Sequence, residues 1–430
     1  MVSSPSRHAI IILAALLVTV GTVRDWRTWR HSAGIDFYQY WVVGKVVARG
    51  DIPSVYDHDT RAAIGQEFLR HALAGPSPRQ RAAANFRNVL EPMSTPFLFA
   101  ALTPFALGDY DTSFDAFLAV SLGALLLGVF ALGRVVGLAP LERVLVLAFV
   151  VFAFEPVAAD LRVGNVGQLH LGMVALYVWL STGQGTARQV VAGAVLGAAT
   201  AFKPSLAAVG PLLLASWGFD RDWRRMAAQG SGLVAGGIGA ILVSAAVFGS
   251  LGAWSDWLTA VRTMPPMAIE AGNVSAVALA ERSWGIRLGP LLTIVSALAV
   301  VVALWLRRRL APPSPNRALP LDLTVVAAGC LVFLISSPLV WLHYLILALP
   351  AALLLLGAES RRQWLAVAGL AAVAITPAGE LLGVRDPIAG ASIVLAGVVA
   401  LFGLVLAEIA APVPRESGSE PPDAAASRAV

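Results

Sequence analysis

Long apolar runs recur along almost the whole sequence, separated by short stretches that carry arginine. Each run is close to the length that a tilted helix needs to cross the apolar part of a bilayer. Hydrophobic residues make up 57% of the 430 residues and charged residues only 13%, so a soluble core of ordinary size could not hide this apolar surface. We therefore expect an all-α polytopic membrane protein with roughly twelve transmembrane helices. The runs lie at 9–23, 113–133, 143–158, 167–183, 189–202, 205–218, 227–248, 288–306, 321–336, 339–357, 363–378 and 388–408.

The pattern predicts one integral membrane domain over residues 1–411. Residues 24–92 are too polar to cross a bilayer and contain two or three amphipathic helical patterns, so they are expected to form a large first outer loop on the membrane. The segment 92–107 is apolar but short and is interrupted by Pro96 and Pro104, which favours a re-entrant segment. Residues 412–430 are rich in Pro, Ser, Ala and Glu and predict a disordered tail.

Arginine clusters in alternate loops predict the orientation, because basic loops stay on the cytoplasmic side of a membrane. The other loops, among them those around Asp36, 162–168, 203–204, 254–287 and 337–343, would then face the outside of an inner or plasma membrane. Arg24, Arg27 and Arg30 are an exception to this assignment. The expected cytoplasmic arginines are Arg134, Arg143, Arg188, Arg221, Arg224, Arg225, Arg307, Arg308, Arg309, Arg361 and Arg362.

Charge and cysteine content exclude several classes of site. The formal charge of +5 comes mostly from these short arginine clusters, and no basic domain suited to nucleic acid is present in the sequence. The single cysteine, Cys330, lies in an apolar run, which excludes a disulfide framework and a cysteine-rich metal site. Glycines inside the runs, such as Gly193, Gly197, Gly236, Gly237 and Gly239, favour close helix packing.

Asp36 stands in an aromatic segment, Asp36-Phe37-Tyr38-Gln39-Tyr40-Trp41, just after the first apolar run. Aromatic rings prefer the headgroup region, so we expect this carboxylate at a membrane surface. One interpretation is a helix N-cap for the amphipathic run that follows. The other is a general base, and the two are compatible because a cap fixes the rotamer that a base needs.

Lys203 and His343 are ionisable groups in apolar surroundings. Lys203 interrupts a long apolar stretch and precedes Pro204, so it either snorkels from a helix break or binds an anion such as a phosphate. His343 can donate to a phosphate or a sugar oxygen. Trp341, two residues earlier, is expected at the membrane edge as a belt residue.

Amide groups open the apolar run that starts at residue 167. Asn165 and Gln168 can hydrogen-bond sugar hydroxyls, or they can cap the helix and bind its neighbours. Asp160 and Arg162 lie just ahead and are interpreted as a simple ion pair. Arg287 follows Trp284 on the predicted outer side and either contacts an anionic lipid or anchors the span.

As a set, these residues resemble the polytopic glycosyltransferases of family 87, which have the GT-C fold and include polyprenol-phosphate-mannose-dependent α-mannosyltransferases. Where the family usually shows a Tyr-Pro-Pro element, this chain has Glu91-Pro92-Met93-Ser94-Thr95-Pro96. The matching pieces are Asp36-Phe37 and Tyr40, Gly50, Val55-Tyr56-Asp57, Glu91-Pro92, Pro96, Leu102, Pro104-Phe105, Gly167-Gln168, Lys203-Pro204, Ser337-Pro338, Trp341 and His343.

The resemblance implies a function as well as a fold. Asp36 would be the general base of an inverting transfer of a hexose, above all mannose, from a polyprenyl-phosphate donor to a lipid or glycan acceptor, with no metal or other cofactor. Lys203, with His343 or Arg287, would bind the donor phosphate. Sugar or acceptor contacts would come from Tyr40, Asn165, Gln168 and Trp341.

A competing interpretation is a transporter or lipid-binding membrane protein without transferase activity, in which Lys203 and His343 line a pathway through the bundle. The long first outer loop and the lack of an evident paired internal repeat disfavour this interpretation. A structural partner that has lost activity is a third alternative, and replacing Asp36 by Asn separates it from an active enzyme.

Overall fold

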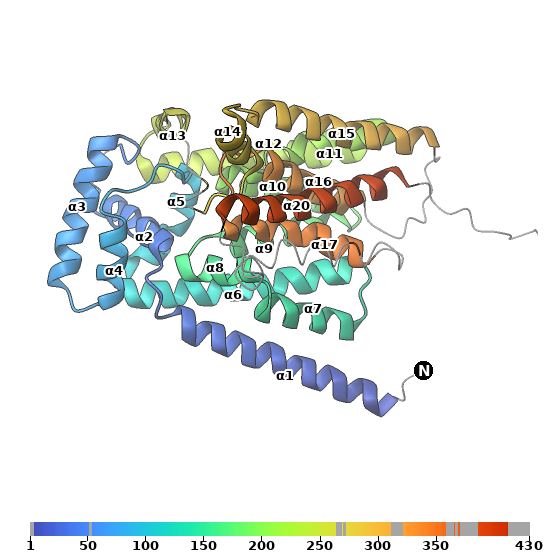
Figure 1. Ribbon diagram of the computed structural model, residues 1–430. Coiled ribbons are helices and arrows are strands. Elements are labelled where there is room, and N and C mark those ends of the chain that lie inside the picture. The colour runs from blue at the N-terminus through green and yellow to red at the C-terminus, as the bar shows by residue number, and fades with distance from the viewer. Residues whose placement is uncertain are drawn as a thin grey trace, which may run out of the picture.

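The chain folds into a bundle of helices. The computed structural model describes residues 4–50, 54–263, 269, 272–310, 321–357, 365, 369 and 386–411, and it contains no strand in these ranges. Figure 1 shows the long helices running side by side, with several short helices gathered at one end. The predicted tail at 412–430 and most of the run at 363–378 lie outside the described residues.

Four helices of the described chain are long and apolar enough to cross a membrane: α6 (Tyr110–Val135), α12 (Trp223–Phe248), α15 (Gly289–Leu310) and α20 (Pro387–Ala410). A fifth candidate is the pair α7 (Pro140–Phe152) and α8 (Glu155–Val163), bent by 54° at their junction. These four or five spans confirm a helical membrane protein, and they are fewer than the twelve crossings expected from apolar runs.

Several predicted runs form shorter or broken helices. The long α1 (Ser4–Trp29) packs against α7, whereas the run at 143–158 is broken by the bend between α7 and α8. The shorter helices that fill the bundle are α9 (Gly167–Ser181), α10 (Thr186–Phe202), η2 (Pro204–Leu206), α11 (Val209–Asp220), α16 (Leu321–Ser336), η4 (Leu342–Ala348) and α17 (Leu349–Leu356).

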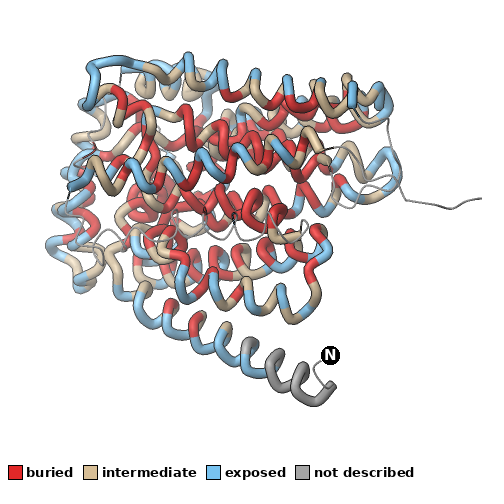
Figure 2. Tube along the Cα trace, turned by 45° about the vertical axis from the view of Figure 1, so that its right-hand side comes forward, coloured by how far each residue is buried: buried red, intermediate tan, exposed pale blue. Residues whose placement is uncertain are grey.

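Burial divides the helices into an inner and an outer set. α16 is buried on almost every residue and packs against α11, α15, α17 and α20. By contrast, α15 exposes Leu291, Ile294 and Leu298, and α1 exposes Ile12 and Leu16. Figure 2 shows the same division, with buried residues concentrated inside the bundle. Exposed apolar faces of this kind suit contact with lipid chains.

The predicted first outer loop forms helices at one end of the bundle: α2 (Ile35–Ala48), α3 (His58–Ala74) and α4 (Pro78–Phe86), followed by α5 (Pro96–Leu102) and η1 (Thr103–Leu107). α5 and η1 together are about 20 Å long, short of the roughly 30 Å of a bilayer core. Glu91 ahead of them donates its N–H to Gln39, and Tyr110 after them donates to the carbonyls of Ala33 and Gly34. The segment 92–107 therefore returns to the end at which it began, as a re-entrant segment does.

At the same end, α13 (Gly252–Thr263) and α14 (Ala276–Trp284) lie on the surface of the bundle (Figure 1). α13 has no buried residue, yet Trp257 donates its indole N–H to the carbonyl of Met93 at 3.3 Å. This bond ties α13 to the segment between α4 and α5.

Glycines let α10 and α12 approach until their backbones touch. A Cβ on Gly193 would lie 2.0 Å from the carbonyl oxygen of Gln229, and one on Gly236 would lie 2.1 Å from that of Ala194. Gly197 and Gly232 make equivalent approaches. The expected small-residue packing is thus present, but with Gly232 in place of Gly237 and Gly239, whose Cβ positions face open space.

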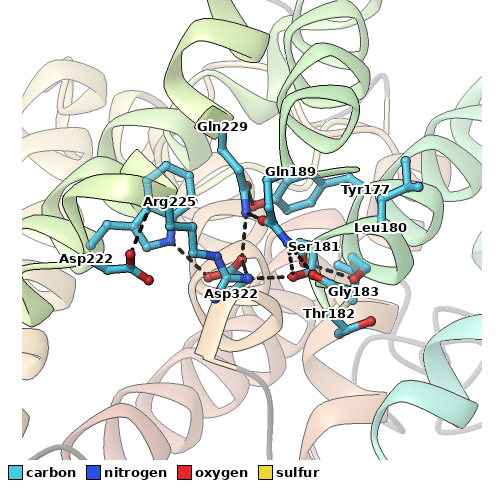
Figure 3. Close-up of polar contacts among 12 residues, drawn as sticks. Tyr177, Leu180, Ser181, Thr182, Gly183, Gln189, Asp222, Arg225, Gln229 and Asp322 are labelled. Atoms are coloured by element: carbon cyan, nitrogen blue, oxygen red, sulfur yellow. Dashed lines mark hydrogen bonds and ion pairs between the residues drawn. The ribbon is translucent and has the colours of Figure 1, made fainter. Parts of the chain in front are cut away.

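The opposite end of the bundle is held by a buried polar network (Figure 3). Asp322, in the first turn of α16, pairs with Arg225 of α12 at 2.5 Å and accepts the indole N–H of Trp217 in α11 at 3.1 Å. Arg225 also donates to the carbonyl of Ser181 at 2.7 Å. A buried carboxylate needs such partners, so this network links the ends of α9, α11, α12 and α16.

Candidate active site

A cavity of about 500 Å³ opens at the end of the bundle that carries α2 to α5. Its walls come from six segments of the chain: the start of α2, the segment from α4 to α5, the end of α8 with the turn that follows it, the end of α10, Gly272, and the start of η4. Six of the eight residues predicted for the site line it: Asp36, Tyr40, Asn165, Lys203, Trp341 and His343.

Asp36 lies in the first turn of α2, directly after a tight backbone turn at Gly34. Gly34 precedes the helix with a φ of +62°, and a Cβ there would lie 2.7 Å from the ring of Phe114, so only glycine fits without strain. Gly34 is the N-cap and Asp36 is the second helical residue, with no capping bond from its side chain. The N-cap interpretation of Asp36 is therefore wrong, because the N-cap position is two residues earlier, at Gly34.

The Asp36 carboxylate is buried and bound at both oxygens. Its Oδ1 pairs with the guanidinium of Arg87, and its Oδ2 accepts from Nδ2 of Asn165 at 2.7 Å. Arg87 is only 6% exposed and also pairs with Glu91. A buried ion is expensive unless it is paired and hydrogen-bonded, and these contacts meet that condition while fixing the orientation of the carboxylate.

Asn165 links this carboxylate to Lys203. The preceding Gly164 has a φ of +68° and would place a Cβ 2.7 Å from Phe37, so the turn after α8 requires glycine there. Asn165 Oδ1 accepts from Lys203 Nζ at 3.0 Å. The side-chain amide of Asn165 therefore donates to the Asp36 carboxylate through its nitrogen and accepts from the Lys203 ammonium through its oxygen.

Lys203 stands at the helix break predicted from Pro204. α10 ends at Phe202, and Lys203 adopts an extended conformation before η2. Its ammonium lies 4.0 Å from the ring centre of Tyr344, close enough for a cation–π contact. Lys203 is thus fixed in the cavity wall.

His343 contributes a polar atom without a partner. Its side chain is buried, and Nε2 has no hydrogen-bond partner within the described part of the chain. Buried imidazole nitrogens are normally satisfied, so an unsatisfied one in a cavity wall is suited to bind a ligand.

Two predicted residues do not reach the cavity. Gln168 is fully buried, lies outside the lining, and donates its backbone N–H to Asp160 at 3.3 Å. Arg287 is also outside the lining and pairs with Glu281 at 3.1 Å, with its side chain 77% exposed.

The suggested ion pair of Asp160 with Arg162 does not form in the described structure. Asp160 is fully buried and accepts the backbone N–H groups of Gly167 and Gln168, at 3.2 and 3.3 Å. Arg162 is exposed and lines the cavity. The two side chains, two positions apart in α8, leave the helix on different sides.

Sequence reasoning missed Arg87 and the role of Glu91. The only local signal was their spacing of four, which pairs side chains along a helix. Burial raises the pKa of the Glu91 carboxyl above its usual range, against the opposing effect of the Arg87 guanidinium. Glu91 is therefore a carboxylate whose ionised form depends on Arg87.

The fold and the cavity define a polytopic helical membrane protein whose cavity wall holds a fixed carboxylate and a fixed ammonium. More specifically, the chain belongs to glycosyltransferase family 87, because the family model described as Glycosyltransferase family 87 matches residues 95–338, more than half of the chain. Comparisons with curated proteins and with solved structures give no match. The matched range contains Asn165 and Lys203, and Asp36 lies ahead of it.

Proposed function

We propose that this glycosyltransferase is an inverting enzyme that moves a hexose, mannose above all, from a polyprenyl-phosphate donor to a lipid or glycan acceptor. Family membership supports the transfer of a sugar. The observation that carries the finer proposal is the pairing of Asp36 and Lys203 through Asn165 in one cavity. A transfer from a sugar phosphate needs a base for the acceptor hydroxyl and a cation for the departing phosphate.

In the proposed reaction, Asp36 is the general base. It takes the proton of the acceptor hydroxyl while that oxygen forms a bond to the anomeric carbon. The bond from this carbon to the phosphate oxygen breaks on the opposite face, so a β-linked donor gives an α-linked product. The leaving group departs as polyprenyl phosphate.

Lys203 and His343 are proposed to bind the departing phosphate. An ammonium held in a cavity wall and an unpartnered imidazole nitrogen are suitable donors to phosphate oxygens. Tyr40, Asn165 and Trp341 are proposed to contact the sugar or the acceptor. Gln168 and Arg287 are left out of these roles because neither lines the cavity.

We further propose that the chain has the GT-C architecture with about twelve crossings in one domain over residues 1–411. The active site would face the outside of the inner or plasma membrane. Support comes from the loops predicted to lie outside, which supply the walls of the cavity.

The test is transfer of radiolabelled mannose from polyprenyl phosphate by purified protein, with membrane lipid extract as acceptor and a chelator present. Asp36→Asn is compared with Asp59→Asn, a control on α3 whose side chain is 99% exposed. We expect wild type and Asp59→Asn to be active in chelator and Asp36→Asn to lose activity by about 10²-fold or more.

Each other result corrects a defined part of the proposal. An active, correctly folded Asp36→Asn enzyme would remove Asp36 as the base. A folded wild type inactive with mannose but active with another lipid-linked sugar would change the donor. Movement of labelled lipid across a vesicle membrane with no new glycosidic bond would favour the transporter.

A further inference from the structure

Arg87 is shared between two carboxylates in the cavity wall. One terminal nitrogen pairs with Asp36 and the other with Glu91, while Nε donates to the carbonyl of Ile35 at 3.2 Å. The side chain of Arg87 is 7% exposed, that of Asp36 10% and that of Glu91 34%. The guanidinium of Arg87 is thus a buried cation with two negatively charged partners. One is the proposed base, Asp36, and the other is Glu91, which lies nearer to the solvent.

This arrangement matters when the charge of Asp36 changes. A general base becomes a neutral carboxylic acid once it has taken a proton. If Asp36 were the only partner of Arg87, that step would leave a buried guanidinium without a counter-charge, which is strongly unfavourable. Glu91 keeps Arg87 paired in both protonation states of Asp36.

We propose that Glu91 is a positioning residue that acts through Arg87: it holds the guanidinium charge-compensated and in place while Asp36 accepts the acceptor's proton. The inference rests on the proposed role of Asp36 as general base. The covalent step is unchanged, because neither Arg87 nor Glu91 gains or loses an atom. The proton moves from the acceptor hydroxyl to Asp36 and later from Asp36 to solvent.

Glu91 also acts on how readily Asp36 accepts a proton. With Glu91 present, the positive charge of Arg87 is divided between two carboxylates. Without it, the whole charge acts on Asp36, stabilises the ionised carboxylate and makes it a weaker base. The other groups whose charge or hydroxyl interacts with Asp36 are Tyr40, Tyr110, Asp160, Lys203, His343 and Tyr344.

The test is the pH dependence of transfer by Glu91→Gln, which removes the charge and keeps the size of the side chain. We expect kcat to fall about 10- to 100-fold, the donor KM to stay within about twofold, and the acid limb of the kcat/KM profile to move to lower pH. Glu91→Asp should restore part of the rate and the wild-type position of the acid limb.

The matched control is Glu67→Gln, which removes a carboxylate from another arginine pair. Glu67 pairs with Arg49 at 2.7 Å on the surface, outside the cavity lining. We expect its kcat and pH profile to equal those of wild type. A Glu91→Gln enzyme that also keeps the wild-type kcat and acid limb would overturn the proposal, as would a loss confined to donor KM.

A double-mutant cycle tests whether Glu91 acts through Arg87. In an Arg87→Gln background, the guanidinium with which Glu91 pairs is gone, so adding Glu91→Gln should cost no further activity if Glu91 acts through Arg87. Losses that multiply would show that Glu91 acts independently of Arg87 and would overturn the inference.

Two readouts separate this inference from the function on which it depends. If Asp36→Asn retains wild-type transfer, the proposed base is wrong whatever Glu91 does. If Asp36→Asn is inactive and Glu91→Gln keeps the wild-type rate and pH profile, Asp36 remains the proposed base and the proposed role of Glu91 is wrong. Thermal unfolding of each variant shows whether a lost rate reflects lost folding, and the Glu91→Asp variant supplies the kinetic test if Glu91→Gln does not fold.

Discussion

Asn165 is the residue that holds the two charges of the pocket in fixed relation. Its amide nitrogen serves Asp36 and its amide oxygen serves Lys203, at 2.7 and 3.0 Å. Because an amide has a donor and an acceptor on one planar group, it can satisfy both ions without changing their charges. A carboxylate or an ammonium in the same place would add a like charge beside one of them.

Asn165→Asp tests this linkage with almost no change in size. The new carboxylate loses the bond to Asp36 and repels it, so we expect kcat/KM to fall about 10- to 100-fold, the equivalent of one hydrogen bond to a charged group. Initial rates of radiolabelled transfer measure the effect. Asn85→Asp, on an exposed position of α4, is the control and should match wild type. Equal rates for the two variants would show that the linkage is dispensable.

At the scale of elements, helix packing sets where the site residues lie. α10 carries Lys203 at its end, and its position is fixed by backbone contact with α12 through Gly193, Gly197, Gly232 and Gly236. Small residues at such a contact allow close approach that larger side chains prevent. The distance between α10 and α12 therefore helps to determine the position of the Lys203 ammonium.

Gly236→Ala and Gly237→Ala form a matched pair for this contact. A Cβ on Gly236 would lie 2.1 Å from the backbone oxygen of Ala194, whereas one on Gly237 meets open space. We expect Gly236→Ala to destabilise the protein by about 1–3 kcal/mol through overpacking and to reduce transfer, and Gly237→Ala to leave both unchanged. Thermal unfolding in detergent and initial rates test this. Equal unfolding temperatures would contradict the packing argument.

The N-cap of α6 gives a pH-dependent prediction. Backbone and hydroxyl bonds from Thr112 hold the pKa of Asp109 below its usual 3.8. Because the folded pKa is lowered, the stabilising contribution of Asp109 is present above about pH 4 and is lost as the pH falls through the folded pKa. Asp109→Ala should therefore unfold at a lower temperature than wild type at pH 7, with the gap shrinking towards pH 3. A gap independent of pH would contradict the ionised cap, and Asp109→Asn should keep most of the stability at pH 7.

At the scale of the molecule, the bundle has two different ends. One end carries the cavity with Asp36 and Lys203. The other gathers arginine-bearing loops, where Arg307 pairs with Asp220 at 3.1 Å and Arg225 with Asp322. These are the loops that the alternation of arginines assigns to the cytoplasm.

Single cysteines test the proposed orientation, because the natural Cys330 is fully buried. Arg70→Cys lies on an exposed position of α3 at the cavity end, and Arg224→Cys lies on an exposed position at the other end. In intact cells, a membrane-impermeant maleimide should label Arg70→Cys and should reach Arg224→Cys only after permeabilisation. The reverse pattern would place the cavity on the cytoplasmic side.

Sequence alone predicted Asp36 and Lys203 for the site but not the charged residue that pairs with Asp36. Asp36 and Lys203 stand out because ionisable groups next to apolar runs are costly. Arg87 lies 51 positions from Asp36, so no local pattern joins them. Gln168 and Arg287 failed to reach the cavity for the complementary reason: hydrogen-bonding capacity can be read from residue type, but the direction of a side chain depends on how its helix is rotated and packed.

The sequence by itself determined that the protein is helical, that it is built for a membrane and that it belongs to its family, since these follow from composition, periodicity and the order of motifs. The tertiary structure determined that α2 begins after a turn at Gly34 and that the segment 92–107 returns to the end of the bundle at which it began. It also determined the bends that divide apolar runs into short helices. It also decided the pairing of Asp36 with Arg87 and Asn165. The physical reason is that apolar character depends on each residue alone, whereas the pairing of buried charges depends on which distant segments share a cavity wall.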